Sequence, residues 1–144
     1  MAAAVTAADA HCRARGLHFT PQRRRVLEIL LDGHRAMGAY DILERLRDEG
    51  LGSQPPVAYR ALDFLVAQGF AHKIERINAF VACAHSGAEH DPAFLICRVC
   101  CAVAEAEAGP ARTAITAAAR GAGFRVERVA IEAEGLCPRC AEAA

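Results

Sequence analysis

Apolar residues recur at helical spacing in three stretches of the first half of the chain. The first stretch follows Thr20 and Pro21, which suit the N-cap and the first position of a helix. The second covers residues 38–50, with Tyr40 in its apolar stripe, and the third covers residues 55–69. Each of the last two stretches is closed by a glycine, as helix ends often are. The pattern predicts three helices that share a core.

The pattern changes to short β-prone runs after Gly69. Residues 71–75 and 79–83 form two such runs, joined by a turn that contains Asn78. This pattern predicts a β-hairpin. Three helices followed by a hairpin is the order of a winged helix-turn-helix, in which the third helix enters the major groove of DNA.

A polar stretch rich in glycine, proline and histidine separates this part of the chain from a second apolar pattern. Beyond it, short strands, a helix over residues 111–121 and a long strand over residues 124–135 are predicted. The alanine-rich ends of the chain are predicted to fray. The sequence therefore predicts an α+β (α/β) fold with two domains. The expected boundaries are a winged-helix domain over residues 1–83, a linker over 84–93 and an α/β domain over 94–144.

Composition favours a folded protein, because 53% of the 144 residues are hydrophobic. The opening lacks the pattern of a secretory signal, and no apolar run approaches the roughly 18 residues of a membrane span. We therefore expect a cytoplasmic protein with no membrane partner. Thiols are kept reduced in that compartment, so the seven cysteines indicate metal ligands and free thiols rather than disulfides.

Charge is unevenly distributed, although the net charge is zero. Residues 1–31 hold five arginines against two acidic residues, and Arg23, Arg24 and Arg25 are consecutive. Such a cluster suits nucleic-acid phosphates, but it is also typical of a solvated helix face. Both interpretations are open from the charges alone.

Four of the cysteines form two C-x-x-C pairs. Cys97 and Cys100 form the first pair and Cys137 and Cys140 the second, with residues 101–136 between them. Two such pairs supply the four thiolates of a closed tetrahedral site, which is typical of structural zinc. A redox dithiol or an iron centre is the alternative, although a redox pair needs only one such motif.

The remaining unpaired cysteines include Cys101 and Cys12. Cys101 is adjacent to Cys100 but outside the C-x-x-C spacing, so we expect a bystander thiol. Cys12 has no partner in any motif and is expected to act as a small buried hydrophobe.

A second set of potential ligands is dispersed along the chain and forms no short motif. Its members are His72, Cys83, His90 and Glu105. Two imidazoles, a thiolate and a carboxylate are compatible with zinc. Isolated polar residues of these types are more often simply solvated, so the residues alone do not establish a site.

The motifs together resemble the ferric uptake regulator family, most closely its zinc uptake regulator branch. The resemblance covers about residues 10–140 and rests on "FTPQRRRVLEIL", "AYDILERLR", "PPVAYRALDFLVAQGFAHKIE", "NAFVAC", "FLICRVC" and "GLCPRC". It implies a homodimer with an N-terminal winged helix and a C-terminal dimerisation domain. Such regulators bind operator DNA when they are loaded with metal.

The resemblance also implies roles for individual residues, with two zinc ions per monomer. The implied structural zinc ligands are Cys97, Cys100, Cys137 and Cys140. The implied regulatory zinc ligands are His72, Cys83, His90 and Glu105. The expected DNA contacts are Tyr59 and Arg60 on the recognition helix, and Arg23, Arg24, Arg25 and Lys73 toward phosphates.

The chain departs from the family pattern at three places. Val57 stands where the family has threonine, and Cys101 stands where glycine is usual. The histidine cluster of the iron and manganese branches is reduced to His85 and His90. This last departure favours zinc over iron.

The resulting hypothesis is a zinc-dependent repressor that binds a palindromic operator as a homodimer and controls zinc uptake genes. It predicts no enzymatic activity and no small-molecule substrate. A zinc enzyme would need an open coordination position, and no H-E-x-x-H motif occurs. A thiol redox switch, or an iron- or peroxide-sensing member of the same family, is the alternative.

Overall fold

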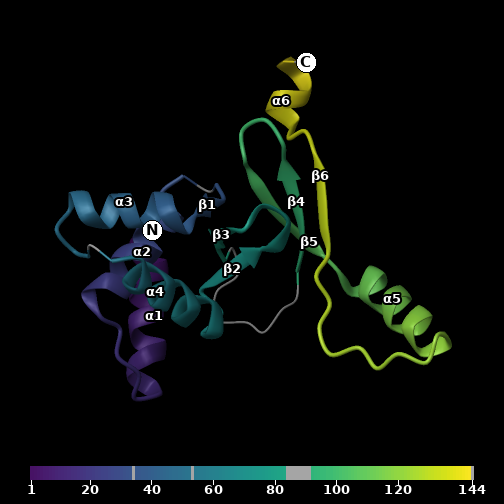
Figure 1. Cartoon of the computed structure of the whole chain (residues 1–144), viewed down its shortest axis with the longest axis horizontal. Coiled ribbons are helices and arrows are strands. Elements are labelled where there is room, and N and C mark those ends of the chain that lie inside the picture. The colour runs from purple at the N-terminus through teal and green to yellow at the C-terminus, as the bar shows by residue number, and fades with distance from the viewer. Residues whose placement is uncertain (34, 53, 84–91, 144) are drawn as a thin grey trace. The chain divides into compact units, whose positions relative to one another are not determined.

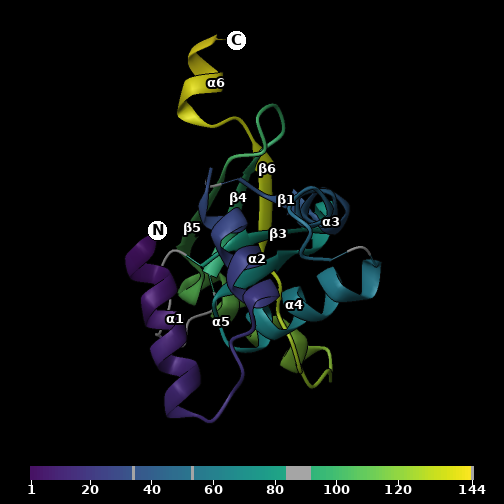
Figure 2. The same ribbon diagram turned by 90° about the vertical axis from the view of Figure 1, so that its left-hand side faces the viewer.

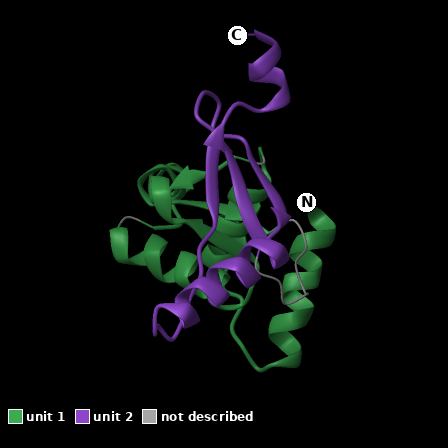
Figure 3. Cartoon of the chain, turned by 90° about the vertical axis from the view of Figure 1, so that its right-hand side faces the viewer, with its two compact units in different colours: residues 1–89 green, residues 90–144 purple. Residues whose placement is uncertain are grey.

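The computed structural model describes residues 1–33, 35–52, 54–83 and 92–143. The chain divides into two compact units, residues 1–89 and residues 90–144, which Figure 3 distinguishes by colour. Figure 1 labels the helices and strands of both units. Each unit has a sheet of its own. Most of the predicted linker lies outside the described residues, so the predicted domain boundaries stay a prediction.

The first unit contains four helices. They are α1 (Ala2–Ala14), α2 (Pro21–Leu31), α3 (Ala39–Asp48) and α4 (Pro55–Ala67). All four bury apolar side chains in one core, whose largest fully buried side chains include Ile29, Leu30, Ile42, Leu46, Leu62 and Leu65. Among the described residues, no helix combines the length and hydrophobicity that a membrane crossing requires.

The start of α2 confirms the predicted capping signal. The Oγ1 atom of Thr20 accepts a hydrogen bond from the backbone N–H of Arg23 at 3.2 Å, and Pro21 occupies the first turn. From this start the helical period turns Val26, Leu27 and Leu30 into the core.

The sheet of the first unit is antiparallel and has the order β1-β3-β2. Its strands are β1 (Met37–Gly38), β2 (Ala71–Ile74) and β3 (Ala79–Ala82). A short 3₁₀ turn, Glu75–Ile77, and Asn78 at φ +47° connect β2 to β3. Figure 2 shows this hairpin together with α2, α3 and α4, which confirms the predicted winged helix-turn-helix.

The second unit is an α/β unit built around β4 (Pro92–Cys97). Strand β4 pairs antiparallel with β5 (Val103–Glu107) and parallel with β6 (Glu132–Gly135). Helix α5 (Gly109–Gly121) lies in the connection that makes the parallel pairing possible. The chain ends in a short helix, α6 (Pro138–Ala143). The predicted α+β class is confirmed.

The long strand predicted over residues 124–135 is wrong in its extent, because only β6 is a strand. The register places Phe94 opposite Glu132, and β4 begins only at Pro92. Within the described residues, β4 therefore has no residue opposite 124–129. Alternating apolar residues predict a strand, but a strand also needs a neighbour with which to form hydrogen bonds.

The N-terminus, which is predicted to fray, forms a helix, and Tyr40, which the sequence pattern places in an apolar stripe, is exposed. Helix α1 packs Val5, Ala8 and Cys12 into the core, and α6 continues through most of the alanine-rich C-terminus. Tyr40 is 66% exposed, because Ile42 takes the inward position on α3. Alanine has the highest helix propensity, so these ends form helices where packing or a cap supports them.

Candidate metal centres and nucleic-acid interface

The four cysteines of the two C-x-x-C pairs meet in the second unit. Cys97 is the last residue of β4, and Cys137 directly precedes α6. The parallel register pairs Cys97 with Gly135, which brings the second pair to the end of the strand that carries the first. The Sγ atoms of the four cysteines all lie within 4.8 Å of one another.

The sulfurs of this cluster exchange hydrogen bonds and are not joined by disulfides. The Sγ atoms of Cys100 and Cys137 are 3.8 Å apart, and the N–H of Cys140 donates to the Sγ atom of Cys137 at 3.5 Å. All seven cysteines of the chain are free thiols. The cluster is therefore a set of potential ligands at close range.

The pKa values of these thiols move in opposite directions. Backbone N–H groups of Cys100, Cys137 and Val99 lower the pKa of Cys97 to about 6. Hydrogen bonding with Cys137, followed by burial, raises the pKa of Cys140 to about 12. Four neighbouring sulfurs cannot all carry a negative charge unless a cation balances them. The donor set fits zinc, which prefers four thiolates in a closed site.

The two remaining cysteines outside any cluster lie in different environments. Cys101 is exposed and has φ +62°, although it follows Cys100 directly. Cys12 is buried in the core of the first unit, where burial and the charge of Asp9 raise its pKa. Burial and a raised pKa both make Cys12 unreactive, as a structural thiol is.

Two of the predicted regulatory ligands lie together in the first unit. His72 is on β2 and pairs with Val81, while Cys83 follows the end of β3. The ligand atoms of His72 and Cys83 lie within 4.8 Å of each other. The Nε2 atom of His72 is buried and Cys83 is 7% exposed, so both groups are largely shielded from solvent.

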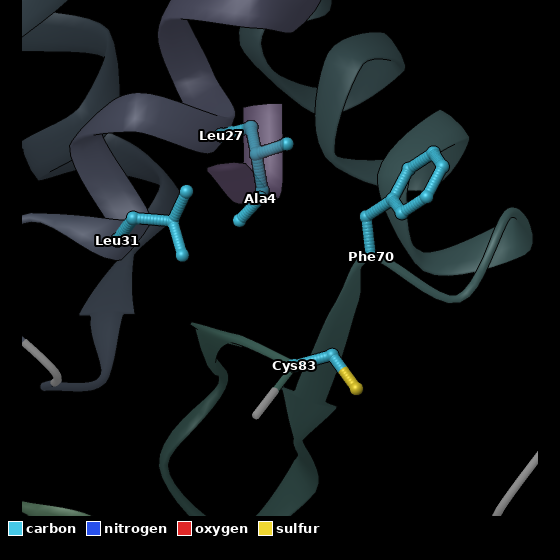
Figure 4. Close-up of a pocket in the computed structure, with 5 residues that line it drawn as sticks. All are labelled: Ala4, Leu27, Leu31, Phe70 and Cys83. Atoms are coloured by element: carbon cyan, nitrogen blue, oxygen red, sulfur yellow. The ribbon is translucent and has the colours of Figure 1, made fainter. Parts of the chain in front are cut away.

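A backbone hydrogen bond and an apolar pocket position Cys83. The N–H of Cys83 donates to the carbonyl oxygen of Phe70 at 2.9 Å. Figure 4 shows Cys83 on the wall of a pocket that it shares with Ala4, Leu27, Leu31 and Phe70. Nothing in the sequence pattern indicates the bond between Cys83 and Phe70, because it joins the two ends of the hairpin.

The other two predicted regulatory ligands belong to the second unit. Glu105 is half-buried on β5, opposite Phe94 of β4. His90, like His85, lies outside the described residues. Each of these positions stays a predicted ligand.

The outer face of α4 carries the predicted recognition residues. Tyr59 is 49% exposed and Arg60 is also exposed, whereas Ala58 and Leu62 of the same helix are buried. The Nε atom of Arg60 donates to the carbonyl oxygen of Pro56 at 3.2 Å. Lys73 is exposed on β2. The winged-helix order makes this face of α4 the candidate nucleic-acid interface.

The three consecutive arginines of α2 have partners within the first unit. Arg25 makes two hydrogen bonds with the carboxylate of Glu49, and Arg24 lies 3.5 Å from a carboxylate oxygen of Asp9. The guanidinium of Arg23 lies 3.9 Å from the ring centre of Phe64. Each arginine therefore has a role in packing, whatever it does toward phosphates.

A winged helix followed by a unit with a four-cysteine cluster defines a DNA-binding protein of the metal-dependent type. The family described as the ferric uptake regulator family matches residues 14–134. The chain belongs to the ferric uptake regulator family, which confirms the resemblance inferred from the sequence.

The individual relatives point to the zinc branch. The chain is 40% identical over 136 residues to the zinc uptake regulation protein of Escherichia coli (strain K12), covering 94% of this chain and 80% of the relative. A zinc uptake regulator solved in complex with zinc and DNA has a TM-score of 0.89 and 38% identity, covering 96% of this chain and 93% of that one. The holo form of XcZur has a TM-score of 0.83 and 41% identity, covering 96% of both chains.

Proposed function

We propose that this protein is a zinc-responsive transcriptional repressor that controls zinc uptake genes. The observation that carries the proposal is the similarity over nearly the whole chain to a zinc uptake regulator complexed with zinc and DNA. The four-cysteine cluster and the exposed face of α4 supply the chemistry that such a regulator needs. These relatives favour a zinc regulator over the redox-switch and the iron- or peroxide-sensing alternatives.

The proposed structural site consists of Cys97, Cys100, Cys137 and Cys140. Zinc, when bound, supplies the divalent charge that lets all four sulfurs be thiolates together. Cys97 ends β4 and Cys100 lies in the turn that follows it, whereas Cys137 and Cys140 lie at the start of α6. Their joint ligation would fasten α6 to the sheet, which stabilises the fold of the second unit.

The proposed regulatory site consists of His72, Cys83, His90 and Glu105, so the protein would hold two zinc ions per monomer. His72 and Cys83 are supported by their proximity on the hairpin and by their burial. Zinc would bind tightly only in those conformations that bring the ligands of both units together. Binding of zinc would therefore shift the population toward these conformations. Zinc would in this way select the state that binds the operator.

The proposed DNA contacts are Tyr59 and Arg60 on α4, with Lys73 on the hairpin toward a phosphate. All three are exposed on the winged-helix unit. Arg23, Arg24 and Arg25 are also proposed to contact phosphates. This role comes second to packing, because each of the three already has a partner in the first unit. Two such units in a symmetric dimer would read a palindromic duplex.

The second unit supports the proposal of a homodimer. Helix α5 has no buried residue, although it carries Ile115. Leu95, Phe124 and Leu136 of the same unit are also exposed, by 49%, 75% and 38%. A small unit with this much exposed apolar surface requires a partner, and a second copy of the chain is the simplest partner. We propose a cytoplasmic dimer with no catalytic role and no small-molecule substrate.

The test is to add the protein to labelled duplex DNA from a zinc-uptake promoter, with and without zinc, and to measure binding by fluorescence anisotropy. We expect binding that requires zinc and weakens steeply with salt, because phosphate neutralisation dominates such affinities. Arg60→Ala should weaken binding at least tenfold. Arg13→Ala is the matched control, since the Arg13 side chain is 81% exposed on α1. Equal binding with and without zinc would exclude the proposed function.

A further inference from the structure

The first turn of α4 offers apolar groups where a helix start usually offers amide donors. Pro55 and Pro56 have no backbone N–H. The N–H of Val57 donates to the carbonyl oxygen of Gln54 at 3.0 Å. Both prolines are exposed and Val57 is half-buried, so ring methylenes and valine methyls form the surface of this turn. Such a turn is poorly suited to hold a phosphate with its backbone.

The side chain of Arg60 bonds to this apolar turn. Its hydrogen bond to the carbonyl oxygen of Pro56, at 3.2 Å, holds the guanidinium back toward the start of the helix. Val57 and Arg60 are three positions apart and are therefore neighbours on the helix surface. The N–H donors of the Arg60 guanidinium and the apolar surface of the first turn of α4 thus lie side by side.

Val57 is held against the loop that precedes α4. A Cβ atom built on Gly52 would lie 3.2 Å from the Cγ1 atom of Val57, so one methyl group packs against the backbone of Gly52. A β-branched side chain has few rotamers, and this contact restricts it further. Val57 therefore presents a fixed surface rather than an adaptable one.

We propose that Val57 determines specificity by contacting the 5-methyl group of a thymine beside the guanine that Arg60 reads. In the major groove, guanine offers the two acceptors that suit an arginine, and the thymine methyl is the apolar group. The donors of Arg60 and the neighbouring methyl group of Val57 that does not pack against Gly52 match a guanine and a thymine on adjacent base pairs. This inference rests on the proposed function, because it requires α4 to enter the major groove of an operator.

The test begins with duplexes that the zinc-loaded protein selects from a random-sequence library. Each thymine of a selected duplex is then replaced, one at a time, by deoxyuridine, which lacks only the methyl group. We expect binding to weaken about fourfold at one thymine per half-site, adjacent to an essential guanine, as the loss of one buried methyl predicts. This scan uses the unsubstituted protein, so it does not depend on the folding of a variant.

A variant then assigns the effect to Val57. Val57→Ala should bind the thymine and uracil duplexes equally well. Val66→Ala is the matched control, since Val66 lies on the same helix and is 36% exposed, and it should keep the fourfold difference. Circular dichroism and thermal melting establish that both variants are folded.

Two results would overturn the inference while leaving the proposed function intact. One is zinc-dependent binding with no effect of uracil at any position, and the other is a uracil effect that persists unchanged in Val57→Ala. Failure to select any zinc-dependent duplex would instead overturn the proposed function, and the inference with it.

Discussion

The Sγ atoms of Cys100 and Cys137 lie 3.8 Å apart, although the two residues are 37 positions apart in the chain. The turn after β4 supplies one sulfur, and the residue before α6 supplies the other. The end of β4 and the start of α6 therefore meet at this point in the second unit. Because the second unit has few buried residues, a metal at this point would contribute much of its stability.

Cys137→Ser should abolish zinc binding at this cluster and unfold the second unit. Structural zinc contributes on the order of 10 kcal/mol at pH 7, and three thiolates hold the ion much less tightly than four. Zinc content by atomic absorption and thermal unfolding by circular dichroism measure the effect. Cys101→Ser is the control, because Cys101 is exposed and outside the cluster. Equal zinc content in the two variants would contradict the structural assignment.

Cys101→Gly should stabilise the protein. Cys101 has φ +62°, a conformation that costs a residue with a Cβ atom about 1–2 kcal/mol and costs glycine little. The greater flexibility of glycine in the unfolded chain offsets part of this gain, which leaves about 0.5 kcal/mol. Urea unfolding of the zinc-loaded protein measures the change. Cys101→Ala retains the Cβ atom and the strain, so a gain of the same size in Cys101→Ala would contradict the argument.

Cys83→Ser should fail differently from Cys137→Ser. It removes one proposed regulatory ligand but leaves the four-cysteine cluster intact, so we expect a folded protein with one zinc per chain that no longer binds DNA in response to zinc. Cys12→Ala is the control, since it changes another buried cysteine of the first unit. The measurement is a zinc titration followed by anisotropy of labelled duplex. Normal zinc-dependent binding by Cys83→Ser would exclude the regulatory assignment.

The sequence predicts a structural feature most reliably where a short local motif is enough to specify that feature. Thr20 and Pro21 mark the start of α2 because the cap is made within four residues. The C-x-x-C pairs identify their own partners because thiolate chemistry allows few other arrangements. Both predictions depend on contacts that the neighbouring sequence specifies.

The prediction fails where distant contacts decide. Residues 124–131 have the alternation of a strand, but within the part of the chain that the structure describes β4 offers no partner to residues 124–129. The first residues read as a frayed end, yet Val5 and Ala8 pack in the core. The backbone hydrogen bond from Cys83 to Phe70 is another contact that the local sequence does not predict, because it depends on how the whole hairpin folds.

The contribution of Glu49 to stability should disappear at low pH. Its hydrogen bonds with Arg25 lower the pKa of this carboxylate below the ordinary 4.5. A lowered pKa in the folded state stabilises the protein above pH 4.5, and this stabilisation is lost as the pH falls through the folded value. The melting temperatures of the wild type and of Glu49→Gln should therefore differ at about pH 6 and converge in acid. A difference that stays constant down to acid pH would contradict this origin.

Phe124 gives the most direct test of the proposed homodimer. Its backbone N–H donates to the carbonyl oxygen of Ala119 at 2.8 Å, and Gly123 at φ +81° makes the turn, so the backbone fixes its position at the end of α5. The ring is nevertheless 75% exposed within a single chain. In a monomer, a change to a charged residue at so exposed a position would cost little stability. In a dimer that covers this ring, the same change would leave a charge in an apolar interface.

Phe124→Glu should therefore produce monomers at concentrations at which the wild type is a dimer, with the first unit still folded. Ile77→Glu is the matched control, because Ile77 is an exposed apolar residue of the first unit, 37% exposed. Light scattering across a dilution series gives the mass of each variant, and melting curves show whether the fold survives. A dimer of wild-type strength in Phe124→Glu would show that this surface lies outside the interface. A monomeric wild type would exclude the dimer itself, and the symmetric reading of a palindrome would then lack its structural basis.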